Sequence, residues 1–263
     1  MATTNWQRRI RRAEQLANQH PFAAEILGFY IPIARFQESL YQRLDRVPHQ
    51  APVSLPGLAD SPELLASFPA FLSLVEEKAP AQFAEIGHAL HKSPSNLWSE
   101  LLNHCWSTPE GQPDAPEEFL ALAFLQPYAE LVRVRAHLQV EGYTHSQCPF
   151  CNRKPALGVL RPLGDGARRN LVCGFCLCEW EFRRIVCAGC GQEDQAKLPV
   201  YTAEQFPHIR VECCDACNTY IKSVDLTKNG LADPVVDELA SVPLDLWAQE
   251  HSYAKLRPNL LGM

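Results

Sequence analysis

The sequence predicts an α+β fold, with an N-terminal α-helical bundle followed by two tandem zinc-ribbon modules and a C-terminal helix. Apolar residues recur at helical spacing through much of residues 1–142, four Cys-x-x-Cys pairs then fall within residues 148–217, and β-like runs separate these pairs. Another apolar stripe at helical spacing follows the last pair. We therefore expect four regions, at residues 1–142, 143–186, 187–228 and 229–263.

Length and composition agree with a globular protein of more than one part. The chain has 263 residues, of which 46% are hydrophobic and 21% charged, enough for one sizeable core and a smaller module. No apolar run approaches the roughly 18 residues of a membrane span, and residues 1–12 lack the apolar stretch of a signal peptide. We expect a soluble cytoplasmic protein whose cysteines are reduced. The net charge of −6 argues against binding of bulk nucleic acid.

The first half of the chain reads as a bundle of five or six helices. Helices are expected at residues 6–18, from 21 to 47, at 63–77, 80–91, 94–106 and 117–140, with loops at 48–62 and 108–116. Ser93 is expected to cap the helix that starts at Pro94, and Pro32 and Pro127 are expected to kink theirs.

No catalytic residue or organic cofactor site is predicted. No Ser/His/Asp order, phosphate loop or dinucleotide fingerprint occurs, and His88, His91 and His104 lack the spacing of metal ligands. Cys105 has no partner at ligand spacing, so we expect it to pack as a small buried hydrophobe.

Four Cys-x-x-Cys pairs provide the ligands of two tetrahedral metal sites, because a tight turn aims both sulfurs of a pair at one ion about 2.3 Å away. The pairs can be joined in three ways, and an internal repeat favours joining consecutive pairs, since the nested and interleaved alternatives break the equivalence of the copies. The expected ligands are Cys148, Cys151, Cys173 and Cys176 in site 1, and Cys187, Cys190, Cys214 and Cys217 in site 2.

Each repeat reads as a cysteine turn, a hairpin, a second cysteine turn and a strand. The strands are expected at 156–161, 168–172 and 180–186 in the first copy, and at 197–202, 209–211 and 220–226 in the second, with hairpin turns at 164–166 and 205–208. The residue after each cysteine turn often has left-handed backbone angles, which Asn152, Gly191 and Asn218 suit and Leu177 does not.

The repeats differ in charge. Residues 148–190 carry seven Lys or Arg against three Asp or Glu, whereas residues 191–226 carry three against six. The first repeat therefore either has an ordinary solvated surface or meets an acidic partner through its arginines, at positions Arg161, Arg168, Arg169, Arg183 and Arg184. After the repeats, Asp233 is expected to cap a helix that Pro234 begins and Pro243 interrupts, followed by an extended tail.

Several motifs resemble those of the formate dehydrogenase accessory protein family, FdhE. They read Cys148-Pro149-x-Cys151, Arg169-x-Leu171-x-Cys173-x-x-Cys176-x-x-Glu179-Trp180-x-x-Arg183, Cys187-x-x-Cys190, Cys214-Asp215-x-Cys217 and Asp237-x-Leu239-Ala240-Ser241. The resemblance implies a helical domain and two rubredoxin-like modules that bind iron. It also implies a cytoplasmic accessory protein, not an enzyme, that binds the catalytic subunit of respiratory formate dehydrogenases and is needed for their activity.

The sequence departs from this family at Cys178 and Cys213, which stand beside ligand positions, and at Asn152, where glycine is usual. We expect strand alternation to point the two extra thiols away from the metal. Two other functions stay open. One is a thiol–disulfide protein that uses the Cys-x-x-Cys pairs. The other is a nucleic-acid-binding zinc ribbon, which the basic first repeat and Trp180 favour. Iron is the expected metal, with zinc as the alternative, and only iron would allow redox sensing.

Overall fold

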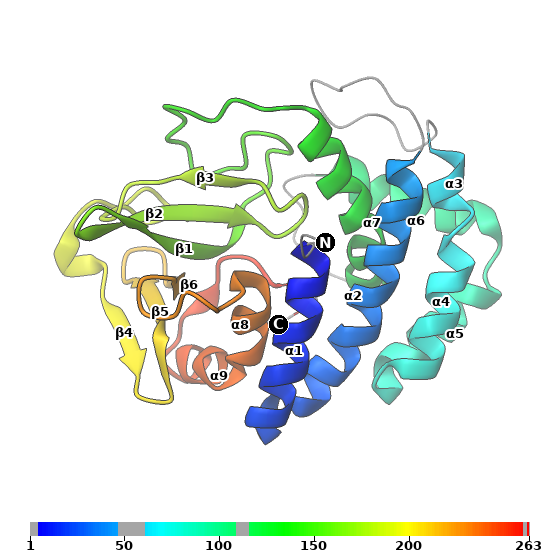
Figure 1. The fold of residues 1–263 in the computed structure, drawn as a ribbon, viewed down its shortest axis with the longest axis horizontal. Coiled ribbons are helices and arrows are strands. Elements are labelled where there is room, and N and C mark those ends of the chain that lie inside the picture. The colour runs from blue at the N-terminus through cyan, green and yellow to red at the C-terminus, as the bar shows by residue number, and fades with distance from the viewer. Residues whose placement is uncertain (1–4, 47–60, 109–115, 260–261, 263) are drawn as a thin grey trace.

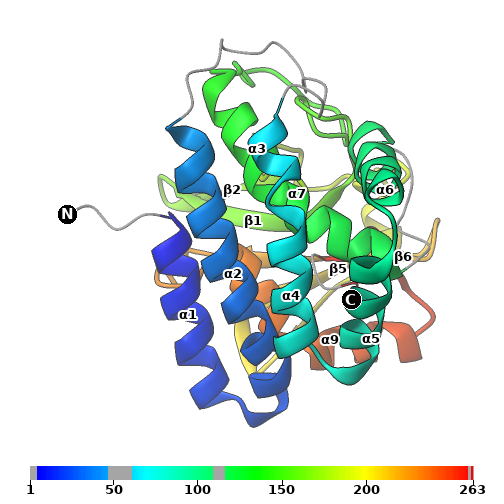
Figure 2. The ribbon, with the colours of Figure 1, turned by 90° about the vertical axis from the view of Figure 1, so that its right-hand side faces the viewer.

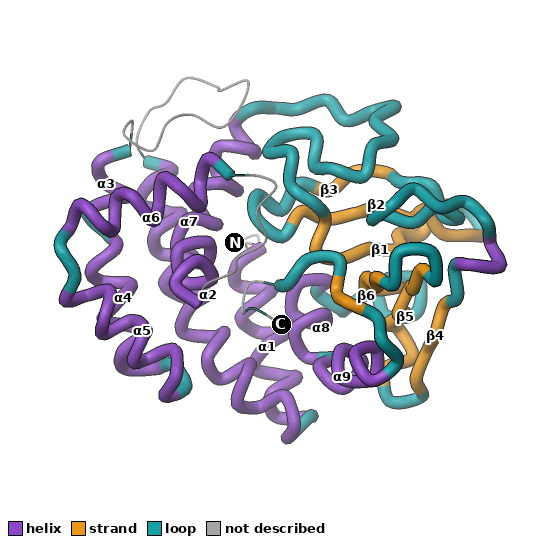
Figure 3. Tube along the Cα trace, turned by 180° about the vertical axis from the view of Figure 1, so that it is seen from behind, coloured by secondary structure: helices purple, strands orange, loops and turns teal. Residues whose placement is uncertain are grey.

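The protein has a helical side and a sheet side that meet along α1 and α8. The structure, a computed structural model, describes residues 5–46, 61–108, 116–259 and 262. Helices gather on one side of the molecule and strands on the other (Figure 1 and Figure 3). The predicted α+β order is therefore confirmed. Among the described residues, no helix combines the length and apolar character that crossing a membrane requires.

Helices α1, α2 and α7 form the centre of the helical side, and α2 also packs against α4 (Figure 2). The helices are α1 (Asn5–Gln19), α2 (Ala24–Asp45), α3 (Pro62–Leu65), α4 (Phe68–Lys78), α5 (Ala81–Lys92), α6 (Ser95–Ser107) and α7 (Pro116–Arg135), with a short 3-10 turn at Pro21–Ala23. Helices α2 and α7 run on through Pro32 and Pro127. The loops expected at 48–62 and 108–116 lie almost entirely outside the described residues.

Three expectations for the helices were wrong. The helix expected at 117–140 ends at Arg135. The helix expected at 63–77 is divided into α3 and α4. Ser93 does not cap α6, which begins at Ser95; its hydroxyl instead donates a 2.7 Å hydrogen bond to the carbonyl of Leu90 at the end of α5. A serine between two helices can donate a hydrogen bond to a carbonyl of the preceding helix or accept one from an amide of the next. Here the hydroxyl of Ser93 bonds to the preceding helix.

The two repeats share one sheet. Its strands are β1 (Pro155–Leu163), β2 (Gly166–Cys173), β3 (Glu179–Glu181), β4 (Val200–Ala203), β5 (Phe206–Cys214) and β6 (Thr219–Asp225), in the order β3-β2-β1-β6-β5-β4. A short strand, β7 (Ala254–Lys255), pairs in parallel with the beginning of β6. Within each repeat neighbouring strands are antiparallel, and β1 and β6 join the repeats in parallel.

The strand predictions hold except at three places. The strand expected at 197–202 begins only at Val200, because residues 195–197 form a short 3-10 turn. The second hairpin turns at residues 204–205, so Phe206 already belongs to β5. The strand expected at 180–186 is only β3, because the chain turns beyond it and its carbonyl oxygens accept hydrogen bonds from a side chain. The guanidinium of Arg169 donates to the carbonyl oxygens of Arg183 and Val186, at 3.0 and 3.4 Å, so these carbonyls do not face a strand partner.

All four cysteine turns lie at one end of the sheet. Strands β1 and β6 begin just after a cysteine turn, and β2 and β5 end at one. Because β1 and β6 run in the same direction and β2 and β5 run against them, these four strand ends, and the three turns that they border, lie at the same end of the sheet. The fourth turn, with Cys187 and Cys190, is brought there by its sulfurs, which lie beside those of Cys214 and Cys217. The hairpin turns lie at the opposite end.

The largest hydrophobic core runs without interruption from the helices into the first repeat. It joins Phe68, Phe124 and Trp106 of the helical side to the cysteines of the first repeat and to Leu256 of the tail. A separate core beneath the second repeat contains Phe206, Val211, Tyr220 and Ala248, and none of the four site 2 cysteines.

Helices α8 (Pro234–Ala240) and α9 (Val242–Glu250) cover part of the second repeat. As predicted, Asp233 caps α8, accepting hydrogen bonds from the amides of Val235 and Val236, and the apolar stripe is broken near Pro243. A buried group of charges holds this region together. The Nζ atom of Lys222 lies 2.6 Å from Asp245 and 3.0 Å from Glu238, and Lys255 of β7 lies 2.5 Å from the same Glu238 oxygen.

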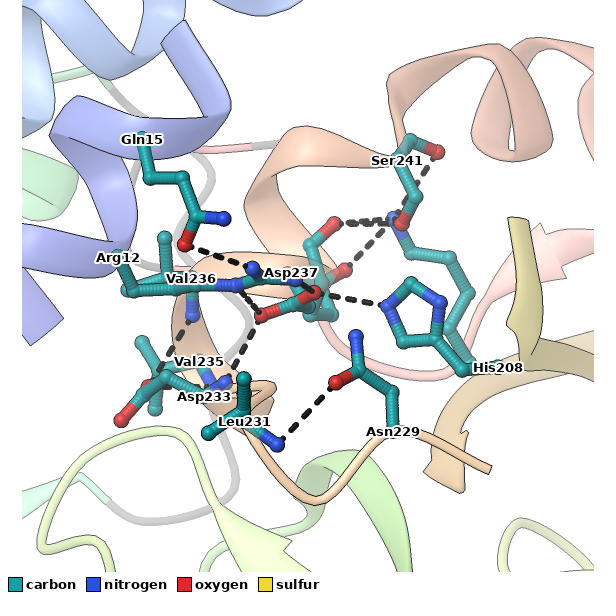
Figure 4. Close-up of polar contacts among 12 residues, drawn as sticks. Arg12, Gln15, His208, Asn229, Leu231, Asp233, Val235, Val236, Asp237 and Ser241 are labelled. Carbon is teal, nitrogen blue, oxygen red and sulfur yellow. Dashed lines mark hydrogen bonds and ion pairs between the residues drawn. The ribbon is translucent and has the colours of Figure 1, made fainter. Parts of the chain in front are cut away.

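A second buried ion pair joins α1 to α8. Both oxygens of Asp237 accept hydrogen bonds from the guanidinium of Arg12, at 2.9 and 2.6 Å, and His208 Nε2 lies 2.8 Å from one of them (Figure 4). Burial opposes ionisation of Asp237, but hydrogen bonds from Arg12 and His208 outweigh it and lower the pKa of this carboxyl.

Candidate metal centres

The structure brings the cysteines together as two groups of four, and the groups consist of consecutive pairs. In each group the four sulfurs all lie within 4.8 Å of one another. The first group, site 1, is Cys148, Cys151, Cys173 and Cys176; the second, site 2, is Cys187, Cys190, Cys214 and Cys217. This is the arrangement that the sequence repeat favours, and the nested and interleaved alternatives are not the ones formed.

The sulfur spacing fits a tetrahedral metal ion. Four sulfurs about 2.3 Å from one ion lie about 3.8 Å from each other. In site 1 the distances are 3.5 Å from Cys148 to Cys176 and 3.4 Å from Cys151 to Cys173. In site 2 both corresponding distances are 3.7 Å. The donor set, all sulfur and closed, is typical of iron or zinc.

Backbone amides in the cysteine turns point at the sulfurs. The amide of Phe150 donates to Cys148 Sγ at 3.4 Å, that of Phe175 to Cys173 Sγ at 3.4 Å, and that of Gly189 to Cys187 Sγ at 3.3 Å. Hydrogen bonds of this kind favour the thiolate, which is the form that binds a metal.

Left-handed backbone angles follow all four turns. Asn152 has a φ of 59°, Gly191 of 78° and Asn218 of 53°, as expected for residues that tolerate this region. Leu177 also adopts a φ of 54°, so the expectation drawn from its residue type was wrong. The geometry of the turn thus overrides the residue preference, at a local cost of about 1 kcal/mol.

The two groups of sulfurs differ in exposure. All four cysteines of site 1 are buried, and Cys173 and Cys176 are 0% exposed. In site 2, Cys190 is exposed and Cys217 partly so. A cavity of about 420 Å³ borders site 2 and is lined by Cys187, Gly189, Cys214 and Thr219, with Ile185 and Val200 on its rim.

The thiols also influence one another electrostatically. Burial and the neighbouring thiols raise the pKa of Cys176 well above its usual value. At Cys173, burial is outweighed by hydrogen bonds with the other three thiols, which lower its pKa. In site 2, burial opposes ionisation of Cys217, but Thr219, 3.1 Å from its sulfur, and the other thiols lower its pKa to about 7. Only a cation at their centre stabilises four such thiolates together, so a metal ion fits both groups.

Comparisons with known proteins agree with the motifs. Residues 147–184 match the model of the FdhE central domain and residues 185–261 that of the FdhE C-terminal domain. A protein named FdhE homolog from Aquifex aeolicus is 28% identical over 96% of this chain and 94% of its own length, and one from Pseudomonas aeruginosa is 29% identical over 97% and 88%.

The crystal structure of the FdhE protein from Pseudomonas aeruginosa covers 99% of this chain and 96% of its own, with a TM-score of 0.74 at 26% identity. Over nearly its whole length the chain is therefore similar to FdhE proteins. Its two groups of cysteines lie in the parts that match the family's central and C-terminal domains, site 1 in the former and site 2 in the latter.

Sequence reasoning missed two buried arginines beside site 1. Arg153, 1% exposed, has its guanidinium carbon 3.9 Å from the ring centre of Phe175 in the second cysteine turn. Its Nη2 donates to the carbonyl oxygens of Cys105 and Trp106, but its Nε and Nη1 find no hydrogen-bond acceptor in the described structure. The position of Arg153 directly after a cysteine turn was the available signal.

Arg257 of the tail is the second of these arginines and is 5% exposed. Burial is the largest influence on its pKa and lowers it; Cys173 and Cys151 act in the opposite direction, and Arg153 adds to the lowering. Within the described ranges, neither Arg153 nor Arg257 forms an ion pair with a carboxylate. Arg153 lies against Phe175 of the second cysteine turn, and Arg257 follows Leu256, which packs in the core that holds the four site 1 cysteines. Both are therefore buried positive charges around site 1.

The other cysteines and the histidines lie outside both groups of sulfurs. Cys213 packs in the core beneath the second repeat, and Cys178 joins the core around site 1 without belonging to the four. Burial raises the pKa of Cys105 to about 12, which suits a packed thiol. His91 and His104 pair with carboxylates of the helical side, Glu76 and Glu118.

The arginines of the basic first repeat are largely paired within the chain. Carboxylates of Glu179, Glu181, Glu212 and Glu193 lie 2.5 to 3.7 Å from the guanidinium groups of Arg161, Arg168, Arg169 and Arg183, in that order. These internal pairs weaken the case for an acidic partner or a nucleic acid on this surface.

Proposed function

We propose that this chain is an accessory protein that binds the catalytic subunit of a respiratory formate dehydrogenase and is required for its activity. In this proposal both groups of cysteines hold metal, iron by preference and zinc as the alternative. The arrangement of the eight sulfurs carries the metal assignment, and similarity to FdhE proteins, with the function that the family's motifs imply, carries the accessory role.

The contacts of site 1 support a scaffold that a metal ties together. Gln126 of α7 donates a 2.9 Å hydrogen bond to the carbonyl of Gly174, inside a cysteine turn. Arg133, also on α7, donates to the carbonyl of Cys176 at 3.4 Å. A metal in site 1 would fix both carbonyls and so the position of the sheet against α7. The helical side would then offer a stable surface to the client.

The proposal includes no enzymatic turnover. Thiol–disulfide enzymes usually place the attacking cysteine at a helix N-terminus, which lowers its pKa. Here all four pairs lie in turns, three of which adjoin a strand, and none is at the N-terminus of a helix. Ligands that must stay reduced suit a cytoplasmic location.

Metal content tests the first half of the proposal. Full-length protein prepared without oxygen should contain two metal ions per chain, with thiolate-to-metal absorption bands if the metal is iron. Cys148→Ser and Cys187→Ser should each lose one ion, whereas Cys213→Ala should keep both, because Cys213 is a buried thiol outside the two groups of sulfurs. Protein without bound metal under these conditions would refute the metal assignment.

Co-purification from formate-respiring cells tests the second half. The intact protein should recover the catalytic subunit of formate dehydrogenase, and Cys148→Ser should recover less, because loss of site 1 loosens the sheet from α7. Cys213→Ala serves as the control. Recovery of no such subunit with the intact, metal-loaded protein would contradict the accessory role.

A further inference from the structure

The buried arginines beside site 1 need an anion. An arginine is charged at all ordinary pH values, and an isolated buried charge costs several kcal/mol. In the part of the chain that the structure describes, Arg153 and Arg257 have no carboxylate partner, and two nitrogens of Arg153 have no acceptor. Four thiolates around a divalent ion leave two negative charges uncompensated, which is the charge that two arginines balance.

The surroundings of site 2 are different. Three arginines line the cavity at site 2: Arg169 lies 2.6 Å from Glu212, Arg210 lies 2.8 Å from Asp225, and Arg184 is exposed to solvent. Solvent reaches site 2 through Cys190, which is exposed, and Cys217, which is partly exposed. The neighbouring cavity of about 420 Å³ gives an entering ligand room beside Cys187 and Cys214.

Resting on the proposed metal binding, we propose that site 2 is an exchangeable metal site and that Arg153 and Arg257 lock the metal of site 1 in place. The entering ligand is a small thiol or a chelating molecule with access to Cys190. Arg153 and Arg257 are positioning residues that act through charge and do not bind the metal.

Different opening motions account for the difference in exchange. Site 1 belongs to the large core shared with the helices, so its metal leaves only when that core opens. Site 2 lies where β5 ends and β6 begins, and its four cysteines belong to neither core, so a local opening of one turn exposes its metal. On release, bonds to the chelator replace the sulfur–metal bonds, and the freed thiolates take protons from the buffer.

Metal transfer from zinc-loaded full-length protein to an excess of a coloured chelator tests this inference. The unmodified protein should release two ions per chain in two phases of equal amplitude, with the first at least tenfold faster. In Cys190→Ser the fast phase should be absent, and the slow phase should keep its rate. A single phase for both ions, or a fast phase that survives in Cys190→Ser, would overturn the proposal.

Substitutions of Arg257 test the role of charge. Arg257→Gln should accelerate the slow phase by about tenfold or more, because losing one partner of a buried charge pair mainly speeds dissociation. Arg257→Lys keeps the charge and should keep most of the slow rate. Arg35→Gln, which removes an exposed arginine paired with Glu14 on the helical side, is the matched control and should change neither phase.

The folding of each variant is checked by circular dichroism and by the absorption spectrum of the protein loaded with cobalt in place of zinc. Equal slow rates in Arg257→Gln and Arg257→Lys would refute the role of charge. If Arg257→Gln does not fold, comparison of the unmodified protein with Cys190→Ser and Arg257→Lys still decides the assignment of the phases. Protein that binds no metal would refute the proposed function itself, which is a different outcome from two ions released at one rate.

Discussion

The ion pair between Arg12 and Asp237 should be among the strongest single links between the two sides of the molecule. Asp237→Asn removes the charge that Arg12 faces and puts an amide donor against other donors. The carboxylate accepts from Arg12 at 2.9 and 2.6 Å and from the amide of Asp233 at 2.8 Å, and lies 2.8 Å from His208. The side chains of Arg12 and Asp237 are only 8% and 1% exposed.

Breaking such a buried pair from one side costs about 3–5 kcal/mol, since the remaining charge stays buried without its partner. We therefore expect Asp237→Asn to lower the free energy of unfolding by about this amount. Arg12→Met should cost less, because Asp237 keeps His208 and the amide of Asp233. The double variant should lose about 1–3 kcal/mol less than the sum of the two single losses.

Urea unfolding followed by tryptophan fluorescence and circular dichroism measures these quantities, at one fixed saturating metal concentration so that binding adds the same stabilisation throughout. Arg35→Gln breaks an exposed pair and should cost no more than about 1 kcal/mol. A loss below about 1 kcal/mol for Asp237→Asn, or additive losses in the double variant, would refute the reasoning. In either case Arg12 and Asp237 would behave like a solvated surface pair whose partners act independently.

Three further predictions concern the second repeat and its junction with the first. Lys222→Met leaves Glu238 and Asp245 with one cation fewer and should cost about 3 kcal/mol in urea unfolding; a change under about 1 kcal/mol would contradict it. Burial opposes ionisation of Glu238, but Lys222 and Lys255 lower its pKa to about 2 in the folded chain. The stability from this carboxylate is therefore complete above about pH 4.5 and lost as the pH falls towards 2, so Glu238→Gln should flatten the acid limb of a pH–stability curve. Gly158→Ala would place a methyl group 2.1 Å from Ser223 Oγ and 3.1 Å from its Cβ where β1 meets β6, costing about 1–3 kcal/mol in thermal unfolding. Gly28→Ala in α2, with nothing within 4 Å, should instead stabilise by about 0.5–1 kcal/mol, and equal effects of the two changes would contradict both expectations.

Local patterns were enough to predict the cysteine groups and most of the elements around them. The Cys-x-x-Cys spacing determines which sulfurs share a turn, and the repeat indicates which turns come together. Alternation within the hairpins and the Asp233-Pro234 cap are likewise local signals, and the structure contains them where expected.

Long-range partners could not be predicted in this way. The parallel pairing of β1 with β6 depends on a contact between residues more than sixty positions apart, such as Gly158 and Ser223. The strand expected at 180–186 ends early because Arg169 donates hydrogen bonds to its carbonyl oxygens. The hydroxyl of Ser93 donates to a carbonyl of α5 and does not cap α6. In each case two partners compete for one backbone group, and the tertiary structure decides between them.

The repeat explains why the two sites share sulfur geometry, and the helices explain why they differ. Both sites are built by strands that begin or end at the same end of one sheet, so spacing and hydrogen bonds to sulfur are alike. Of the two sets of sulfurs, only those of site 1 lie in the core that α6 and α7 supply, with Arg153 and Arg257 among the residues packed around them. Ligand spacing therefore predicts which residues can hold a metal, but exposure and neighbouring charge determine how firmly it is held. Since both are set by what packs on the repeat and not by the cysteines themselves, duplication of one ribbon can produce a permanent site and an exchangeable site without any change of ligand.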